Sequence, residues 1–515
     1  MTNLSRLTHA KHNIKSAALL KVITPLTSFV TRTVVIYTLG NVYLGLNSLF
    51  TSMLQVLSLA DLGFGSAMVF SMYKPIAEND EDTVCALLSF YRMVYRIIGT
   101  IILATGIILI PFLPKLIKNT LPADLNLTAL YLIRLSDTCL SYFLFSYRNC
   151  LFDASQQRRF LSQIQSLGKI ILCLLQVGIL LIFKSYYLFC LAIPFVQIMQ
   201  NLFFYILSVQ TFPNYVCRGK LPKETIQDIA QRVSGLFLFK VSHVLRNSFD
   251  SIILSMFLGL DILAKYQNYF LIITTLVGIT SILTDSTLSG IGNSIALEST
   301  DKNYRDFNTF QLLFMTMTGI ICSCMCCIYQ PFILFWAHAG NMFPNQIMLL
   351  FVIYFFTERM GNICFQYRQA SGLWSHDRIR PLVDGVTNLT LNYILVQRIG
   401  IAGVMLSTIL CHIFIDSLWA SSILFRYYFT KEKQSKYLLR LSFYALVTMI
   451  ACTLTMAICR FLPMEGTNAF YSILFIFARA IICLGISSLL FYFSCRKLSE
   501  FSDAMAIVSR IVKRG

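Results

Sequence analysis

One apolar segment of the sequence, 233–258, carries five side chains that could hold an ion or an anion within a membrane. In chain order they are Lys240, His243, Arg246, Asn247 and Asp250. At about 100° per residue these positions fall within an arc of about 120° on a helix, so the five side chains share one face. Arg246 lies about thirteen residues into the segment, or about 20 Å along a helix, where its guanidinium cannot easily reach water. This face predicts a polar cavity, with a structural Arg246–Asp250 pair as the alternative.

A second basic face is expected on the first apolar segment, 16–38. Lys21 and Arg32 are spaced so that a helix returns them to one side within about 20°, with Pro25 and Ser28 between them. We expect Arg32 to line the same cavity as Arg246. Lys21 either lines it too or extends its ammonium group to the lipid headgroups, because it lies near the start of the segment.

Seven further ionisable residues are expected at membrane depth, and each is costly there unless it is paired or functional. They are Arg134, Asp137, Asp285, Glu358, Arg359, Asp416 and Arg479. Arg134 with Asp137, and Glu358 with Arg359, could line the cavity or form neutralised pairs that brace the helices. Buried pairing is the simpler interpretation for the three single groups. Of the acids, Asp250, Asp285 and Glu358 could carry a proton or a sodium ion if an ion gradient drives the protein.

The predicted cavity is net basic. Its substrate-binding set comprises Arg246, Arg32, Lys240, Lys21, Arg359, Arg134, His243 and Asn247. Guanidinium groups bind phosphate oxygens through two parallel hydrogen bonds, so the cavity suits an anion. A diphosphate that joins a lipid to a sugar is an anion that a membrane cavity can recruit. We find no catalytic or metal-binding motif in the sequence, and we expect neither enzymatic activity nor a resident cofactor.

The elements that position these residues are predicted from composition. Of 515 residues 56% are apolar and only 13% are charged, with a mean hydropathy of +0.68, so lipid must be the main solvent. The apolar residues form runs of about twenty, each long enough to span a bilayer as a helix. Runs such as 97–113 lack the alternation typical of membrane β-barrels. We predict an all-α polytopic membrane protein of about fourteen transmembrane helices.

The predicted spans are bounded by polar clusters. They cover 16–38, 43–71, 94–117, 127–147, 164–183, 186–209, 233–258, 266–292, 309–337, 346–366, 383–397, 401–425, 441–460 and 468–494. The first is interpreted as a retained helix, because no cleavage site follows it. Nearly all of the 16 cysteines lie within spans, where they are expected to pack as small hydrophobic side chains, without disulfides or a metal.

Basic residues predict the orientation. Most of the 42 Lys and Arg fall in alternate loops and in the two termini, which places both termini in the cytoplasm. The inner clusters are Arg148, Arg158 and Arg159; Arg218, Lys220 and Lys223; Arg368, Arg378 and Arg380; and Lys431, Lys433 and Lys436. Loops that face anionic headgroups account for the net charge of +18, so no nucleic-acid partner is expected.

The first half of the sequence recurs about 220 residues later. Residues 19–40 align without a gap on 238–259, which places Lys21 on Lys240, and Tyr147-Arg148 aligns on Tyr367-Arg368. We therefore predict an N-lobe of six helices at 1–209, a cytoplasmic linker at 210–232, a C-lobe of six helices at 233–425, and two additional helices with a tail at 426–515. Lobes of this kind typically hold a substrate between them near the middle of the bilayer.

The segment 36–78, IYTLGNVYLGLNSLFTSMLQVLSLADLGFGSAMVFSMYKPIAE, resembles the start of polysaccharide flippases of the O-antigen type. These belong to the multidrug/oligosaccharidyl-lipid/polysaccharide exporter superfamily, and the resemblance covers essentially the whole chain. It implies transport of undecaprenyl-diphosphate-linked oligosaccharides by alternating access, with Arg246 and Arg32 holding the head group. The LGFGSA and YKPIA stretches are expected to be structural, at the end of the second span and in the loop after it.

Three alternatives remain open at this stage: a flippase for the peptidoglycan lipid precursor, a cation-coupled multidrug exporter of the same superfamily, and a membrane glycosyltransferase or polymerase. The expected setting is the bacterial cytoplasmic membrane, where the chain acts as a monomer among membrane lipids. Polysaccharide polymerase and export machinery are its expected protein partners.

Overall fold

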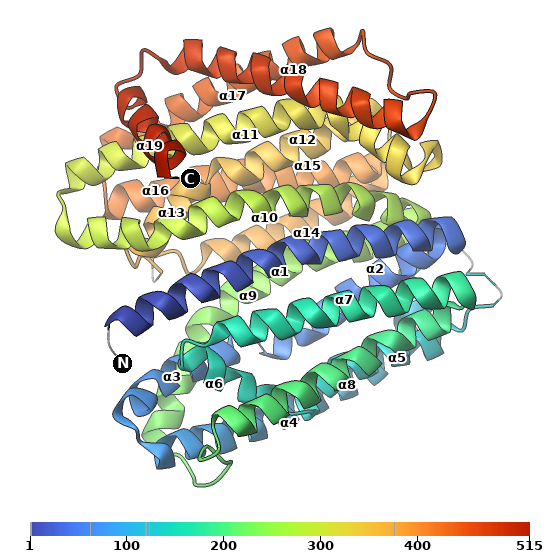
Figure 1. The fold of residues 1–515 in the computed structure, drawn as a ribbon, viewed down its shortest axis with the longest axis vertical. Coiled ribbons are helices and arrows are strands. Elements are labelled where there is room, and N and C mark those ends of the chain that lie inside the picture. The colour runs from blue at the N-terminus through green and yellow to red at the C-terminus, as the bar shows by residue number, and fades with distance from the viewer. Residues whose placement is uncertain (1–2, 62, 119–120, 123, 375, 515) are drawn as a thin grey trace. The chain divides into compact units, whose positions relative to one another are not determined.

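Helices account for every regular element in the part of the chain that the computed structural model describes, residues 3–514 without 62, 119–120, 123 and 375 (Figure 1). Each of the predicted spans coincides with helix, which confirms the all-α membrane fold. Within the described residues, 10 helices are long and apolar enough to cross a membrane. The other predicted spans form shorter or more polar helices.

The chain divides into two compact units, Met1–Gln267 and Asn268–Gly515. The first unit contains α1 (Asn3–Thr38), α2 (Asn41–Leu57), α3 (Phe64–Glu78), α4 (Glu81–Leu109), α5 (Leu127–Phe143), α6 (Asn149–Ala154), α7 (Arg158–Ile182), α8 (Tyr186–Thr211), α9 (Lys223–Leu258) and the start of α10 (Leu260–Leu297). The division falls inside α10, C-terminal of the predicted linker 210–232, because α9 packs on α2 and α3. The duplication itself stays a prediction.

The second unit is built around one long central helix, α11 (Thr300–Ala337), which packs on α12, α17 and α18. The remaining elements are α12 (Asn345–Met360), α13 (Asn362–Ala370), α14 (Arg380–Ile399), α15 (Ile401–Cys411), a π-helical segment (His412–Trp419), α16 (Ala420–Tyr427), α17 (Lys431–Cys459), α18 (Ala469–Cys495) and α19 (Phe501–Arg514). Phe307 and Phe425 join this core with aromatic contacts to Phe429 and Tyr437.

The second predicted span, 43–71, is not one helix, which corrects the sequence interpretation. A 3-10 turn, Ser58–Asp61, follows α2, and Gly63 has a φ of 89°, a left-handed conformation that favours glycine. The chain restarts as α3 at Phe64. The YKPIA stretch lies in the last turns of α3 and not in a loop, because α3 continues to Glu78 and ends at Asn79. The glycines of LGFGSA are thus structural at a helix junction.

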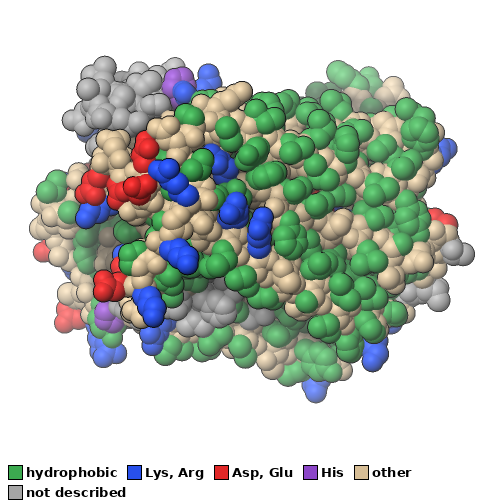
Figure 2. Space-filling view, turned by 90° about the horizontal axis from the view of Figure 1, so that it is seen from below, with side chains coloured by type: hydrophobic (Ala, Val, Ile, Leu, Met, Phe, Trp, Pro, Cys, Tyr) green, Lys and Arg blue, Asp and Glu red, His purple; other side chains and the backbone are tan. Residues whose placement is uncertain are grey.

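Large hydrophobic side chains cover the outer faces of α4 and α8. Ile97, Ile101 and Ile108 of α4, and Phe195 and Phe203 of α8, are each about half exposed or more. Figure 2 shows a broad hydrophobic surface on one face, with acidic side chains gathered toward one side of the view. Apolar surfaces of this extent do not occur on soluble monomers, so these faces are suited to lipid.

Some basic residues assigned to headgroup-facing loops are instead buried. Arg368 and Arg380 are each 5% exposed, and Arg148, also 5% exposed, donates from Nε to Ser208 Oγ at 2.8 Å. Their positions at the ends of helices agree with the loop assignment. Their charged groups, however, contact other residues of the protein instead of lipid headgroups. The contribution of these three residues to headgroup attraction was therefore wrongly predicted.

A buried ionic network holds the second unit together near the end of α13. Asp377 is 6% exposed and lies 2.6 Å from Arg380 Nε and 3.1 Å from Arg368 Nε. Arg380 Nη1 also contacts Asp416 Oδ1 at 2.5 Å, and His412 Nδ1 lies 3.1 Å from Asp416 Oδ2. Asp416, predicted to be paired, is paired here. The network links α13, α14 and the π-helical segment.

Removing Asp377 should destabilise the second unit. The Asp377→Ala variant leaves two buried guanidinium groups without their shared carboxylate, which should cost about 3–5 kcal/mol of unfolding free energy. Thermal unfolding of the purified protein in detergent, followed by intrinsic fluorescence, should show a clear fall in melting temperature. The matched control is Asp301→Ala, which removes an exposed carboxylate paired with Lys433 and should leave the melting temperature unchanged. Equal effects of the two variants would contradict this role for Asp377.

Candidate functional site

Three of the predicted arginines come from helices that all pack on α2. Arg32 lies on α1, Arg134 on α5 and Arg246 on α9, and each of these helices contacts α2 within the first unit. Arg32 and Arg246 are half-buried, and Arg134 is 8% exposed. We call these three residues the α2 arginines. The structure therefore brings part of the predicted basic set to the surroundings of one helix.

Polar side chains of α2 contact two of the surrounding helices. Arg134 Nη2 donates to Thr51 Oγ1 at 3.1 Å, and Ser248 Oγ on α9 donates to Gln55 Oε1 at 3.2 Å. Thr51 and Gln55 are separated by one helical turn, so they lie on the same side of α2. Side chains from α5 and α9 thus converge on one polar face of α2.

The predicted pairing of Arg134 with Asp137 is not formed in the described residues, since no ion pair joins them within 4.0 Å. Asp137 is half-buried. Asp250, in contrast, is 5% exposed and accepts a hydrogen bond from Tyr266 Oη at 3.5 Å, which ties α9 to the start of α10. Asp137 therefore forms no direct ion pair with Arg134, and the described hydrogen bond of Asp250 is to Tyr266.

The other residues predicted to bind substrate do not join the α2 arginines in one described site. Lys21 is exposed on α1. The side chains of Lys240, His243, Asn247 and Asp285 lie outside the described residues. In the second unit Arg359 is 6% exposed, donates to Glu358 Oε1 at 2.8 Å and contacts Thr280 Oγ1 at 3.5 Å. Its charge is already balanced by the neighbouring carboxylate.

Arg479 has a structural environment. It is 5% exposed and donates to the backbone carbonyls of Leu462 at 2.7 Å and Cys327 at 3.3 Å. These bonds tie α18 to α11 and to the connection before α18. Carbonyl groups that end a helix or line a turn need such donors where water is excluded.

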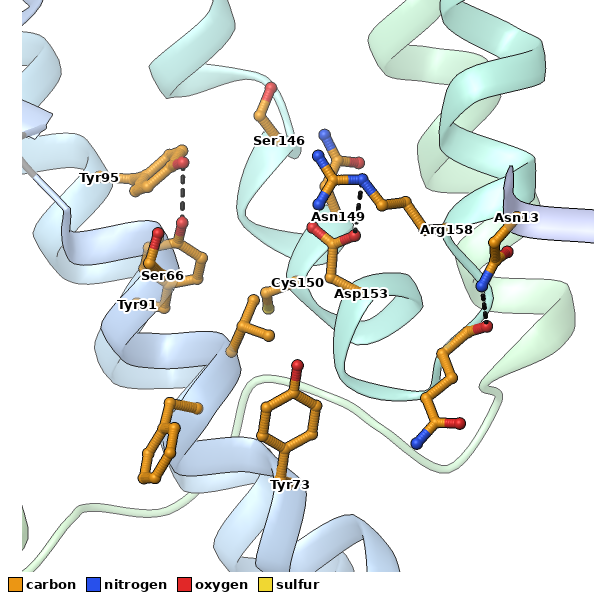
Figure 3. Close-up of a pocket in the computed structure, with 14 residues that line it drawn as sticks. Asn13, Ser66, Tyr73, Tyr91, Tyr95, Ser146, Asn149, Cys150, Asp153 and Arg158 are labelled. Atoms are coloured by element: carbon orange, nitrogen blue, oxygen red, sulfur yellow. Dashed lines mark hydrogen bonds and ion pairs between the residues drawn. The ribbon is translucent and has the colours of Figure 1, made fainter. Parts of the chain in front are cut away.

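A pocket of about 770 Å³ lies within the first unit and was not predicted (Figure 3). Its walls come from α3, α4, α6, the start of α7 and the start of α1. The polar lining includes Asn13, Ser66, Tyr73, Asn149, Asp153 and Arg158. The volume is within the range of about 300–1,000 Å³ that is typical of small-molecule sites. The dense polar run 146–159 was the sequence signal that could have indicated it.

Internal contacts give this pocket a defined shape. Asn13 Nδ2 donates to the Gln156 carbonyl at 2.8 Å and Asn13 Oδ1 accepts from Arg159 N at 2.8 Å, which fixes the start of α1 against the α6–α7 connection. Tyr91 Oη donates to Tyr95 Oη at 2.8 Å on the opposite wall. Figure 3 shows Tyr73 and Asp153 pointing toward the space between these walls.

Asp153 is the one acid in the lining of this pocket. It lies 3.8 Å from Arg158 Nε, a distance compatible with charge attraction but not with a direct hydrogen bond. Burial raises the pKa of Asp153 above its ordinary value, and the Arg158 guanidinium partly opposes that shift. The Asp153 and Arg158 charges offset each other, so the charged part of the lining is close to neutral.

Three cysteines are also brought together, in the second unit. The sulfur atoms of Cys327 on α11, Cys459 on α17 and Cys483 on α18 lie within 4.8 Å of one another, and all three residues are buried. These thiols could hold a soft metal ion, but they are one ligand short of a structural zinc site. Small polarisable thiols also pack well between helices. All 16 cysteines are free.

Comparison with known proteins identifies the fold. No protein-family model and no curated protein matches the chain. Among solved structures, the lipid II flippase MurJ in an inward closed conformation aligns with a TM-score of 0.66 and 14% identity, over 95% of this chain and 100% of its own. An inward-facing MATE-family multidrug resistance transporter of the MOP superfamily aligns with a TM-score of 0.61 and 14% identity, over 79% of this chain and 97% of its own.

A third similar structure is a MOP-superfamily transporter from Pyrococcus furiosus, described as having a binding pocket of reversed polarity. It has a TM-score of 0.55 and 12% identity, over 81% of this chain and 96% of its own. At these identities the likeness establishes a shared fold. The chain therefore has the polytopic fold of MOP-superfamily transporters, and its substrate has to be inferred from its own residues.

Proposed function

We propose that this chain, which has the fold of MOP-superfamily transporters, translocates a lipid-linked oligosaccharide across a bacterial cytoplasmic membrane by alternating access. The proposed substrate is an undecaprenyl-diphosphate-linked oligosaccharide repeat unit for surface polysaccharide. The observation that carries this proposal is that the helices bearing the α2 arginines all pack on α2, and that Arg134 reaches its polar face.

Charge favours an anionic substrate. At membrane depth in the first unit, the α2 arginines outnumber the acids Asp137 and Asp250, and Asp250 already accepts a hydrogen bond from Tyr266. An excess of guanidinium groups at membrane depth is costly, and a bound diphosphate would offset that excess of positive charge. A site that binds cationic drugs would need more acidic than basic side chains.

The second candidate substrate is the peptidoglycan lipid precursor. The likeness to the lipid II flippase MurJ covers most of both chains and favours this candidate. An arginine set can bind the diphosphate of any such lipid, so the two candidates differ in the sugars attached. We propose that a proton or sodium gradient drives transport, with Asp250 as the described acid that could carry the ion. The proposed partners are the polysaccharide polymerase and export machinery, and the transporter acts as a monomer.

Replacing Arg246 should abolish transport without removing the protein from the membrane. Loss of a charge-assisted contact to phosphate should lower the transport rate at least tenfold, or about 1.4 kcal/mol or more, and Arg246→Lys should retain part of it. The measurement is surface polysaccharide in a deletion strain complemented with Arg246→Ala, alongside the amount of tagged protein in membranes. Arg398→Ala, at an exposed helix end, is the matched control and should transport normally. Normal polysaccharide from Arg246→Ala would exclude this residue from the site.

A liposome assay separates the two substrates. Purified protein should move a fluorescent undecaprenyl-diphosphate oligosaccharide across the bilayer, which an external quencher detects as increased accessibility. If only the peptidoglycan precursor is moved, the polysaccharide function is wrong and the second candidate is correct.

The proposed orientation can be tested by cysteine labelling. Lys220 is exposed in the 212–222 connection between α8 and α9, and Glu465 is exposed between α17 and α18. With both termini in the cytoplasm, a membrane-impermeant maleimide added to intact cells should label Glu465→Cys and not Lys220→Cys. Cys217, half-buried near Lys220, is first replaced with serine to remove background. Labelling of Lys220→Cys from outside would reverse the orientation.

A further inference from the structure

The pocket of about 770 Å³ in the first unit is separate in its chemistry from the α2 arginines. Its lining contains one arginine and one carboxylate, which lie 3.8 Å apart, whereas the α2 arginines form a basic set. A diphosphate would gain little from such a nearly neutral lining. The Asp153–Arg158 contact is too long for a strong ion pair, so a neutral ligand with many hydroxyl groups could bind beside it without breaking a strong interaction.

Two acceptor atoms of α6 lack hydrogen-bond donors. The Oδ1 atoms of Asn149 and Asp153 are buried, and neither accepts a hydrogen bond within the described chain. The two residues are four apart on α6, so their side chains lie on the same side of the helix. A buried acceptor without a donor is costly, and a ligand hydroxyl group would satisfy it once the side chain rotates toward the pocket. This wall of the pocket therefore favours a ligand that donates hydrogen bonds.

The opposite wall is aromatic and accessible. Phe70 and Tyr73 on α3 are 54% and 46% exposed, and their rings meet edge to face at 6.2 Å. Arg232 on α9 lies over the Phe70 ring at 4.3 Å, which helps to fix its orientation. The apolar faces of the Phe70 and Tyr73 rings can contact the C–H face of a sugar ring. The Tyr73 Oη atom can at the same time form a hydrogen bond with a sugar hydroxyl.

The pocket also lies far from Arg32 along the same helix. Asn13 in the pocket wall and Arg32 are both on α1, and 19 residues of helix correspond to about 28 Å. The end of α1 at Asn13 is the end that charge distribution predicts to be cytoplasmic. One elongated molecule could therefore contact the pocket with its distal sugars and the α2 arginines with its diphosphate.

We propose that this pocket is a sugar-binding site for a neutral residue of the transported oligosaccharide, in which Asn149 and Asp153 accept hydrogen bonds from sugar hydroxyls and Tyr73 contacts the ring. The site selects the glycan on the cytoplasmic side, independently of the lipid diphosphate. This inference rests on the proposed transport function for its choice of ligand.

Substitutions in this pocket should leave the fold intact. Burial raises the pKa of Asp153, so the folded protein disfavours its charged form. That penalty is absent at low pH and appears as the pH rises through the raised pKa, so at neutral pH Asp153→Asn removes a disfavoured charge while keeping the side-chain shape. The melting temperature of Asp153→Asn should equal or exceed that of the wild type.

The experiment measures glycan binding by full-length protein in lipid nanodiscs. Two probes are used: a printed array of neutral mono- and oligosaccharides, and the neutral oligosaccharides released by mild acid from lipid extracts of the producing strain. The wild type should bind at least one neutral glycan, and inorganic pyrophosphate should not compete. Asn149→Ala, which removes an acceptor, and Asp153→Asn, which replaces a charged acceptor with a weaker neutral one, should each weaken binding about tenfold. Asp82→Asn, an exposed carboxylate outside the pocket, is the matched control and should bind normally.

The outcomes separate this site from the proposed transport function. Arg246→Ala should bind the neutral glycan normally and fail in transport. If no neutral glycan binds in either probe set, or if Asp153→Asn and Asn149→Ala bind as well as the wild type, the sugar site is wrong even when transport is normal. If these variants lose binding while liposome transport of undecaprenyl-diphosphate lipids is absent in the wild type, the sugar site stands and the transport function is wrong.

Discussion

The absence of water from the bilayer interior is the constraint on which this structure depends. Backbone groups exposed to lipid must be satisfied within one helix, and this explains why the described chain is helical and why it ends its helices at protected junctions. The break between α2 and α3 occurs at Gly63, whose left-handed backbone few other residues adopt easily. The same constraint makes each ionisable side chain in a span require a partner or a ligand.

Arginines in this protein meet that requirement in different ways. Arg368 and Arg380 share Asp377, Arg359 contacts Glu358, and Arg479 donates to carbonyl groups at helix ends. These side chains donate their hydrogen bonds to other groups of the protein and thereby stabilise helix packing. The α2 arginines lie on three helices that pack on α2, and Arg134 donates to the neutral Thr51 hydroxyl. A neutral partner satisfies a hydrogen bond of Arg134 but does not balance its charge, which an anionic substrate could do.

The helical fold was predictable because apolar runs of membrane length are read directly from the sequence. Each predicted span falls on helical residues, yet the interruption between α2 and α3 was missed, since the apolar run continues through the glycines at the start of α3. Partners of individual charges were less predictable. Arg134 does not pair with Asp137, although the two share a helix, because Arg134 reaches Thr51 on another helix. Arg380 was assigned to a surface loop because sequence gives its position along a span but not the direction of its side chain. The pocket was missed because its walls come from five separated segments.

If the chain transports a lipid-linked glycan, as proposed, it must release what it binds, and this limits how its binding energy can be distributed between the lipid diphosphate and the glycan. A site that contacted only the diphosphate would bind every diphosphate-linked lipid equally and would not select among the attached sugars. In the proposed sugar site, the hydroxyl groups that donate to Asn149 and Asp153 would add selectivity without tight binding, because each hydrogen bond contributes about 1 kcal/mol net. Under this proposal, the α2 arginines would supply affinity for the shared diphosphate, and the nearly neutral pocket would select the variable glycan. A substrate that binds two conformations equally does not shift their populations, so transport would require the α2 arginines to bind the substrate more strongly in the conformation that receives it.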